Sequence, residues 1–233
     1  MWSGRMQAVM AAGLAVLACG ASGAEGGPAP WAHRNSPFRA VFEVVSQPNT
    51  PKAGLAVVVP VCGLGHAEGT DLYAFSAEGE PLPSLCLGPG TANSALAVVE
   101  ARPGLRQVHV YFGSRITSPQ NRMAFVAPPL LTVRSFSQGN LTTWATVEPL
   151  LARERVLGRL FVDTISLTYN PVNSDDAFIM DFTGALFTPE GLETDLMLVS
   201  DDAGFLFVDD KLLIERGGSH RAHESQRGEA RAA

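Results

Sequence analysis

A chain of 233 residues, 46% hydrophobic and 17% charged, is long enough to bury one large or two small hydrophobic cores. The net charge of −6 provides none of the basic surface that nucleic-acid binding needs, which argues against a nucleic-acid partner. The 23 glycines and 16 prolines recur between short runs rich in valine, leucine and phenylalanine, as in proteins built of many short strands. We therefore expect an all-β protein of two antiparallel, jelly-roll-like β-sandwich units, the second incomplete at its C-terminus.

Residues 1–24 have the features of an export signal, with one arginine near the start, an apolar run at 8–18 and small residues before Glu25. The run is too short to span a bilayer, and no later segment comes close. We expect an exported protein without a transmembrane segment after signal removal, located in the periplasm, at the cell surface or outside the cell. Lipid attachment at Cys19, as in bacterial lipoproteins, is an alternative that Leu17 disfavours.

Residues 25–30 predict a disordered linker, and residues 31–127 predict the first β-sandwich. At its start, Phe38, Ala40 and Phe42 alternate with polar neighbours, the pattern of a strand with one buried face. Further strand-like runs, separated by turn-rich stretches, are residues 55–61, 72–75, 96–100 and 107–112.

Cys62 ends one strand-like run of this unit, and Cys86 lies within another, at residues 82–87. In an oxidising compartment, neighbouring strands could bring the two thiols within disulfide distance. The alternative is two buried cysteines that are not bonded.

Residues 128–158 predict a linker that contains a short helix at 149–158, with Pro149 in its first turn. A second β-sandwich is expected at 159–220, from strand-like runs at 159–170, 177–187, 195–200 and 204–208. Residues 221–233 carry no apolar side chain larger than alanine and predict a disordered tail. Either the last strands of this unit are missing from the chain, or the tail lies outside the fold.

Three acidic pairs occur in this half of the chain. Asp201 and Asp202 precede an alternating apolar strand, and Asp209 and Asp210 stand where that strand should turn, so the stretch predicts a β-hairpin with carboxylates at both ends. The third pair, Asp175–Asp176, also reads as a turn. Carboxylates on loops beside a sheet suit a hard cation such as Ca²⁺ or the hydroxyls of a sugar.

The segments 200–202, 206–209 and 217–220 together resemble the carbohydrate-binding domain named after the anthrax protective antigen, the PA-fourteen type. Residues 178–189 fit the pattern that precedes these segments in the family, so the resemblance covers about 159–220. The chain departs from the pattern in two ways: Asp210 replaces the usual turn glycine, and the closing strands are absent.

The resemblance implies that Asp201 and Asp202 are joined by a cis peptide bond and together hold a Ca²⁺ that also binds sugar hydroxyls. His220 falls where the family has a histidine, without an assigned role. An alternative for the aspartate pair is purely structural, with both residues accepting backbone hydrogen bonds within the loop. For Asp209 and Asp210 we expect only the hairpin turn.

Nothing in the sequence favours catalysis. None of the acidic pairs makes a glycosidase dyad, because adjacency in sequence does not place two carboxyls on either side of a scissile bond. The histidines lack the spacing of a zinc site. In residues 63–69 the third glycine comes one residue too late for a nucleotide-binding loop, and no helix pattern follows.

Residues 31–113 resemble, more weakly, an uncharacterised β-sandwich module of exported bacterial multidomain proteins. The matches are the Trp31-x-x-Arg34-x-x-Pro37 start, Asp71-Leu72 with the residues 79–83, and Tyr111-Phe112-Gly113. Taken together, the sequence predicts a non-enzymatic carbohydrate-binding module. The alternatives are a structural or assembly domain whose partners are other envelope proteins, and an accessory domain of a polysaccharide-degrading enzyme.

Overall fold

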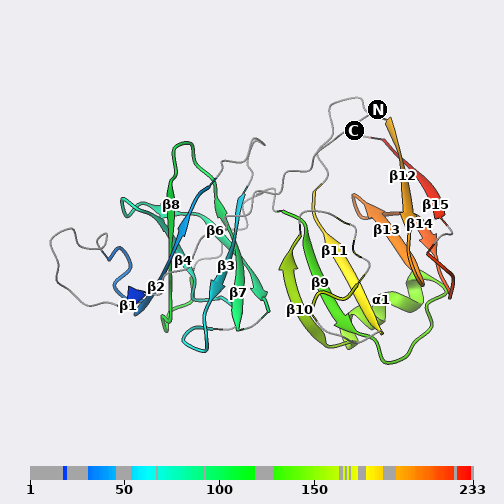
Figure 1. The fold of residues 1–233 in the computed structure, drawn as a ribbon, viewed down its shortest axis with the longest axis horizontal. Coiled ribbons are helices and arrows are strands. Elements are labelled where there is room, and N and C mark those ends of the chain that lie inside the picture. Colours follow the sequence, from blue (N-terminus) through cyan, green and yellow to red (C-terminus); the bar gives the residue numbers. More distant parts are fainter. Residues whose placement is uncertain are drawn as a thin grey trace. The chain divides into compact units, whose positions relative to one another are not determined.

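The computed structural model in Figure 1 is rich in antiparallel strands and has one helix among the residues it describes, which confirms the all-β class. It describes residues 18–19, 31–45, 54–66, 68–91, 93–118, 128–162, 165, 167, 169–172, 177–185, 193–222 and 225–231. The linker 25–30, the Asp175–Asp176 pair, His223 and all of the export signal except residues 18–19 lie outside the described residues.

The chain forms two compact units that are interleaved along the sequence. Unit 1 comprises Met1–Val133, Leu157–Ser174 and Met180–Ala185, and unit 2 comprises Arg134–Val156, Asp175–Ile179 and Leu186–Ala233. No helix in the described part of the chain is long and apolar enough to cross a membrane.

Two antiparallel sheets of unit 1 share one hydrophobic core. The first sheet has the strand order β1-β2-β8-β4-β5, with the bounds Ala18–Cys19, Phe38–Glu43, Gln107–Phe112, Tyr73–Ser76 and Pro81–Leu82. The second has the order β3-β7-β6, with the bounds Gly54–Pro60, Ser94–Glu100 and Ser84–Pro89. Ala40 and Phe42 of the first sheet and Val57 and Val59 of the second all lie in this core.

The alternating pattern of β2 is confirmed on its apolar side, but on its polar side Arg39 is buried and not exposed to solvent. Arg39 points away from the core and is nevertheless only 3% exposed. Its guanidinium carbon lies 5.0 Å from the centre of the Trp31 ring and 5.8 Å from that of Tyr111, so aromatic side chains cover the charge. The outer face of this sheet is therefore packed around Arg39.

A third sheet has the strand order β10-β9-β11, with the bounds Val156–Phe161, Leu130–Ser135 and Phe178–Thr183. Leu131 and Val133 of β9 are fully buried. The expected linker at 128–158 was therefore wrong in its first part, which forms β9 because its apolar residues alternate into a core.

The helix α1 spans Trp144–Arg153, five residues earlier than expected, and Pro149 lies inside it rather than in its first turn. The start is fixed by two threonines. The Thr143 amide donates to Thr146 Oγ1 at 3.3 Å, and Thr146 Oγ1 donates back to the Thr143 carbonyl at 2.8 Å. This threonine pair, and not the proline, marks the N-terminus of the helix.

Unit 2 contains two pairs of strands, β12 (Glu193–Val199) with β15 (Ser225–Arg231) and β13 (Gly204–Val208) with β14 (Lys211–Arg216). The pairing of β12 with β15 runs in unbroken antiparallel register from Glu193↔Arg231 to Val199↔Ser225. A disordered tail was therefore the wrong prediction for these residues. Strand pairing uses main-chain hydrogen bonds, which need no large apolar side chain.

Candidate functional site

The hairpin β13–β14 carries its acidic pairs at opposite ends. At the tip, Val208 pairs with Lys211, and the two residues between them have positive φ angles, 49° at Asp209 and 59° at Asp210. This is the geometry of a two-residue type I′ turn, so Asp209 and Asp210 form the hairpin turn with exposed side chains. The other pair, Asp201 and Asp202, lies just before β13, at the open end of the hairpin.

The loop at the open end brings together two segments of the predicted motif. Ser219 Oγ donates a hydrogen bond of 2.8 Å to Asp202 Oδ1, which joins the segments 200–202 and 217–220. Both aspartates are exposed, and the peptide bond between them is cis, the isomer that the resemblance implies. Two exposed carboxylates therefore lie on one loop, and Ser219 forms a hydrogen bond to one of them.

A close backbone approach fixes the segment after β14. A Cβ atom on Gly217 would collide with the Thr142 carbonyl, and the Gly218 amide donates to the Leu141 carbonyl at 2.9 Å. Only glycine at position 217 lets the two chain segments lie this close. The residues just before α1 thus position the Ser219 side of the site.

The helix start packs against the hairpin itself. The Trp144 ring lies 5.7 Å from the ring of Phe205 and 4.6 Å from that of Phe207, measured between centroids. The Trp144 amide also donates to Glu215 Oε1 on β14 at 2.6 Å. Aromatic packing and a charge-assisted hydrogen bond therefore attach α1 to the hairpin that carries the acidic loop.

Asp201 and Asp202 alone could supply only part of the oxygen ligands that a calcium ion needs. Carboxylate oxygens are the ligands that Ca²⁺ prefers, and Asp201 and Asp202 offer four, one of which already accepts from Ser219. Among the residues that the structure describes, no three His, Cys, Asp or Glu side chains gather in a way that could hold a metal ion. Because Ca²⁺ takes about six to eight oxygens, water, main-chain carbonyls or a ligand's hydroxyls would have to supply the rest.

His220 is not joined to the aspartates by a hydrogen bond. Both of its ring nitrogens are buried and have no hydrogen-bond partner among the residues that the structure describes, and the same holds for the Oγ of Ser200. Imidazole nitrogen is a poor ligand for Ca²⁺, so His220 is not part of the donor set.

Glu154 is a buried carboxylate with a structural role that the sequence did not suggest. Its oxygens accept hydrogen bonds from the Arg153 guanidinium at 2.7 Å and from the hydroxyls of Ser135 and Ser137 at 3.1 and 3.2 Å. The hydrogen bond from Arg153, followed by those from the two serines, holds the pKa of Glu154 below its ordinary value against the opposing effect of desolvation. Glu154 thus ties the end of α1 to the end of β9.

Cys62 and Cys86 are not bonded to each other. Cys62 follows β3 and Cys86 lies on β6, and β7 separates these two strands. Two strand spacings amount to roughly 9.5 Å, beyond disulfide reach. The Cys86 thiol donates instead to the Glu68 carbonyl at 2.5 Å, and burial raises its pKa.

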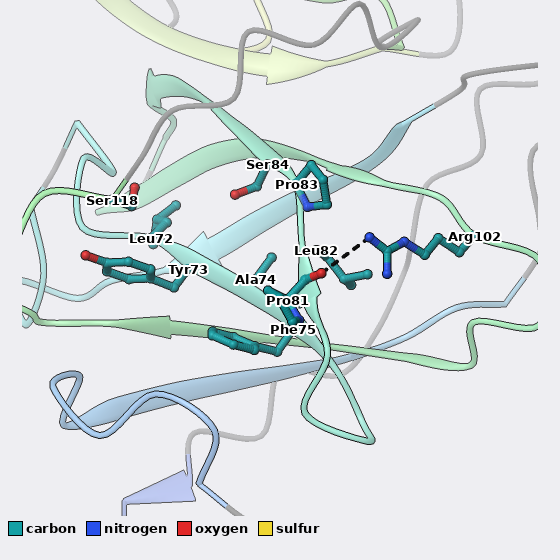
Figure 2. A pocket seen from close by; sticks show the side chains of 10 residues that line it. All are labelled: Leu72, Tyr73, Ala74, Phe75, Pro81, Leu82, Pro83, Ser84, Arg102 and Ser118. Atoms are coloured by element: carbon teal, nitrogen blue, oxygen red, sulfur yellow. Dashed lines mark hydrogen bonds between the residues drawn. The ribbon is translucent and has the colours of Figure 1, made fainter.

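Sequence reasoning missed a pocket of about 490 Å³ in unit 1. Figure 2 shows β4 along one wall, the crossover from β5 to β6 along another, and Arg102 at the side. The only signals in the sequence were the aromatic side chains at alternate positions of 73–75 and the prolines at 81 and 83, which are equally common in ordinary strands and turns.

The chain was compared with protein-family models, with curated proteins and with solved structures, and none of them matches. The resemblance of residues 159–220 to the PA-fourteen type therefore stays a prediction, carried by the residues that suggested it.

Proposed function

We propose that the chain is an exported, non-catalytic binding module that recognises carbohydrate at the cell surface through Asp201 and Asp202. The observation that carries the proposal is the hydrogen bond from Ser219 Oγ to Asp202 Oδ1, which unites two distant segments around two exposed carboxylates. Loops fixed on a sheet in this way are where binding residues gather.

The chemistry of the loop suits sugar hydroxyls. Carboxylate oxygens accept hydrogen bonds from hydroxyl groups, and such charge-assisted bonds are stronger than neutral ones. Ser219 restricts the Asp202 side chain before a ligand arrives, which lowers the entropy that binding must overcome. A Ca²⁺ held by Asp201 and Asp202 would bind hydroxyl oxygens directly and so increase affinity.

The same geometry speaks against hydrolysis as the function of the loop. Glycoside hydrolases place two carboxyl groups about 5 to 10 Å apart on either side of the scissile bond. Here both carboxylates come from adjacent residues of one exposed loop, which leaves the second side of a bound sugar without an acid or base from this pair.

A glycan array tests the proposal on the full chain. Binding is measured in millimolar Ca²⁺ and in EDTA, for the unsubstituted protein, Asp202→Asn and the control Asp210→Asn, which removes the same charge from the hairpin turn. We expect glycan binding that EDTA weakens, that Asp202→Asn lowers at least tenfold, and that Asp210→Asn leaves unchanged. Binding unaffected by Asp202→Asn would refute the assignment to this loop.

A structural or assembly role is the second candidate, favoured by one observation. Met197 and Val199, on the same face of β12, are 60% and 50% exposed. Apolar side chains at alternate positions of a strand make a surface suited to contact with another protein. This role predicts no glycan binding and an association, visible by sedimentation of the full chain, that Met197→Asp reduces.

A further inference from the structure

A second candidate binding site lies in unit 1, in the pocket beside β4. Its volume of about 490 Å³ falls within the range of about 300 to 1,000 Å³ that is usual for small-molecule sites. The residues that line it come from β4, from the crossover between the two sheets and from the turn that holds Arg102, so distant parts of the chain converge there (Figure 2).

One wall of the pocket carries an aromatic side chain that is fixed before any ligand binds. The rings of Tyr73 and His33 are stacked, with centroids 3.9 Å apart and planes 22° from parallel. The Tyr73 hydroxyl also donates to the Ile116 carbonyl at 3.2 Å. Because one ring face and the hydroxyl are occupied, Tyr73 is held in place while it lines the pocket.

Arg102 is fixed in a similar way at the side of the pocket. Its Nε donates to Glu100 Oε2 at 2.6 Å, and its Nη2 donates to the Pro81 carbonyl at 3.4 Å, the bond drawn in Figure 2. Neither bond uses Nη1, whose two N–H groups have no partner in the described part of the chain and can donate to a ligand. A guanidinium oriented by its neighbours loses little entropy when it donates a further hydrogen bond.

The charge of the pocket selects a neutral ligand. Arg102 is the single charged residue among the described residues that line it, and Glu100 pairs with that charge at 2.6 Å. An anionic ligand would meet the Glu100 carboxylate next to the guanidinium. The hydroxyl of Ser84 adds a further polar group to a wall that is otherwise largely apolar.

We propose that this pocket binds a neutral sugar residue, with Tyr73 as the surface for the apolar face of the sugar ring and Arg102 as donor to its hydroxyl oxygens. A sugar ring combines an apolar face with a rim of hydrogen-bonding oxygens, which matches an aromatic ring beside a fixed donor. The site is separate from the acidic loop of unit 2, needs no metal ion and does not rest on the function proposed for that loop.

The test uses the full chain in EDTA, which removes any contribution of Ca²⁺ at Asp201 and Asp202. The probe is an array of neutral oligosaccharides, followed by titration calorimetry with the sugar that binds best. Arg102→Ala and Tyr73→Leu should each lower affinity about tenfold or more. The control Arg106→Ala, an exposed arginine four residues along the chain from Arg102, should change it less than twofold.

Each result decides the proposal. Sugar binding in EDTA with that pattern of losses supports it, provided that Arg102→Ala and Tyr73→Leu keep their melting transitions. If no neutral sugar binds in EDTA, or if Arg102→Ala binds as well as the unsubstituted chain, the pocket is not a sugar site. If Asp202→Asn abolishes the binding seen in EDTA, the sugar lies at the unit 2 loop and the pocket proposal is wrong.

Discussion

Unit 1 and the hairpin of unit 2 are both antiparallel β structure, yet they are stabilised differently. In unit 1 the first six residues of β7 are all buried, and β3 is nearly as deep in the core. In the hairpin, only Gly204 and Ile214 are buried. Broad apolar burial therefore supports unit 1, whereas a few specific contacts around Trp144, Gly217 and Ser219 support the acidic loop.

This difference in burial decides which strands can carry binding residues. A strand that is buried along its length has no side chain to offer a ligand, while a half-buried hairpin exposes its ends. Because the acidic loop depends on few contacts, single substitutions there should affect it more selectively than substitutions in the core of unit 1.

The largest effect is expected for Leu55→Ala in unit 1. Leu55 is fully buried, and truncation of such a side chain leaves a cavity that costs about 2 to 5 kcal/mol. Val58→Ala, three residues along the same strand, is the control, because Val58 is 47% exposed and its loss should cost less than about 1 kcal/mol. Calorimetric unfolding measures the loss of stability in both variants. Equal losses would show that apolar burial is not what stabilises unit 1.

Gly217→Ala should cost about 1 to 3 kcal/mol, because the new Cβ meets the Thr142 carbonyl and backbone must move. Gly218→Ala is the matched comparison: its Cβ meets nothing within 4 Å, but the φ of 86° is unfavourable for alanine by about 1 kcal/mol. Hydrogen exchange of the Gly204–Val208 strand should report the difference. A Gly217→Ala protein with native protection would contradict the close approach.

A smaller effect, dependent on pH, is expected for Glu154→Gln. The lowered pKa of Glu154 means that its ionised form stabilises the fold above the ordinary pKa of 4.5 and that this contribution is lost as the pH falls through the lower, folded value. The melting temperature of Glu154→Gln should therefore lie below that of the unsubstituted chain at pH 7, and the two should converge in acid.

The control for this prediction is Glu148→Gln, an exposed position on the same helix. Its melting temperature should follow that of the unsubstituted chain at every pH. A difference for Glu154→Gln that stays constant from pH 7 to well below 4 would mean that the carboxylate charge is not what ties α1 to β9.

Much of unit 1 could be predicted, because apolar residues alternate along its strands. Alternation placed Ala40 and Phe42 in the core correctly, and residues 107–112 were predicted with the bounds that β8 has. The burial of Arg39 could not be predicted, since it depends on Trp31 and Tyr111, which only the tertiary fold brings over it.

The parts of unit 2 that were mispredicted depend on signals weaker than apolar alternation. Pro149 suggested a helix start, whereas the Thr143–Thr146 pair sets it five residues earlier. The β15 strand has no apolar pattern, because its pairing with β12 is a matter of main-chain hydrogen bonds. The hydrogen bond from Ser219 to Asp202 could not be predicted, because the fold brings these two segments together. The pocket at Tyr73 and Arg102 could not be predicted for the same reason.

The most direct test of the central claim, that the Asp201–Asp202 loop is a binding site, is the melting temperature of the full chain with increasing Ca²⁺. Extracellular calcium modules bind with dissociation constants of about 0.1 to 1 mM, so a titration to about 10 mM covers the range. At 100 times the dissociation constant the stabilisation is about 2.7 kcal/mol, a rise of several degrees. We predict that rise for the unsubstituted chain and for Asp210→Asn, and its loss in Asp202→Asn. Melting curves that coincide with and without Ca²⁺, or a rise that survives Asp202→Asn, would contradict the account.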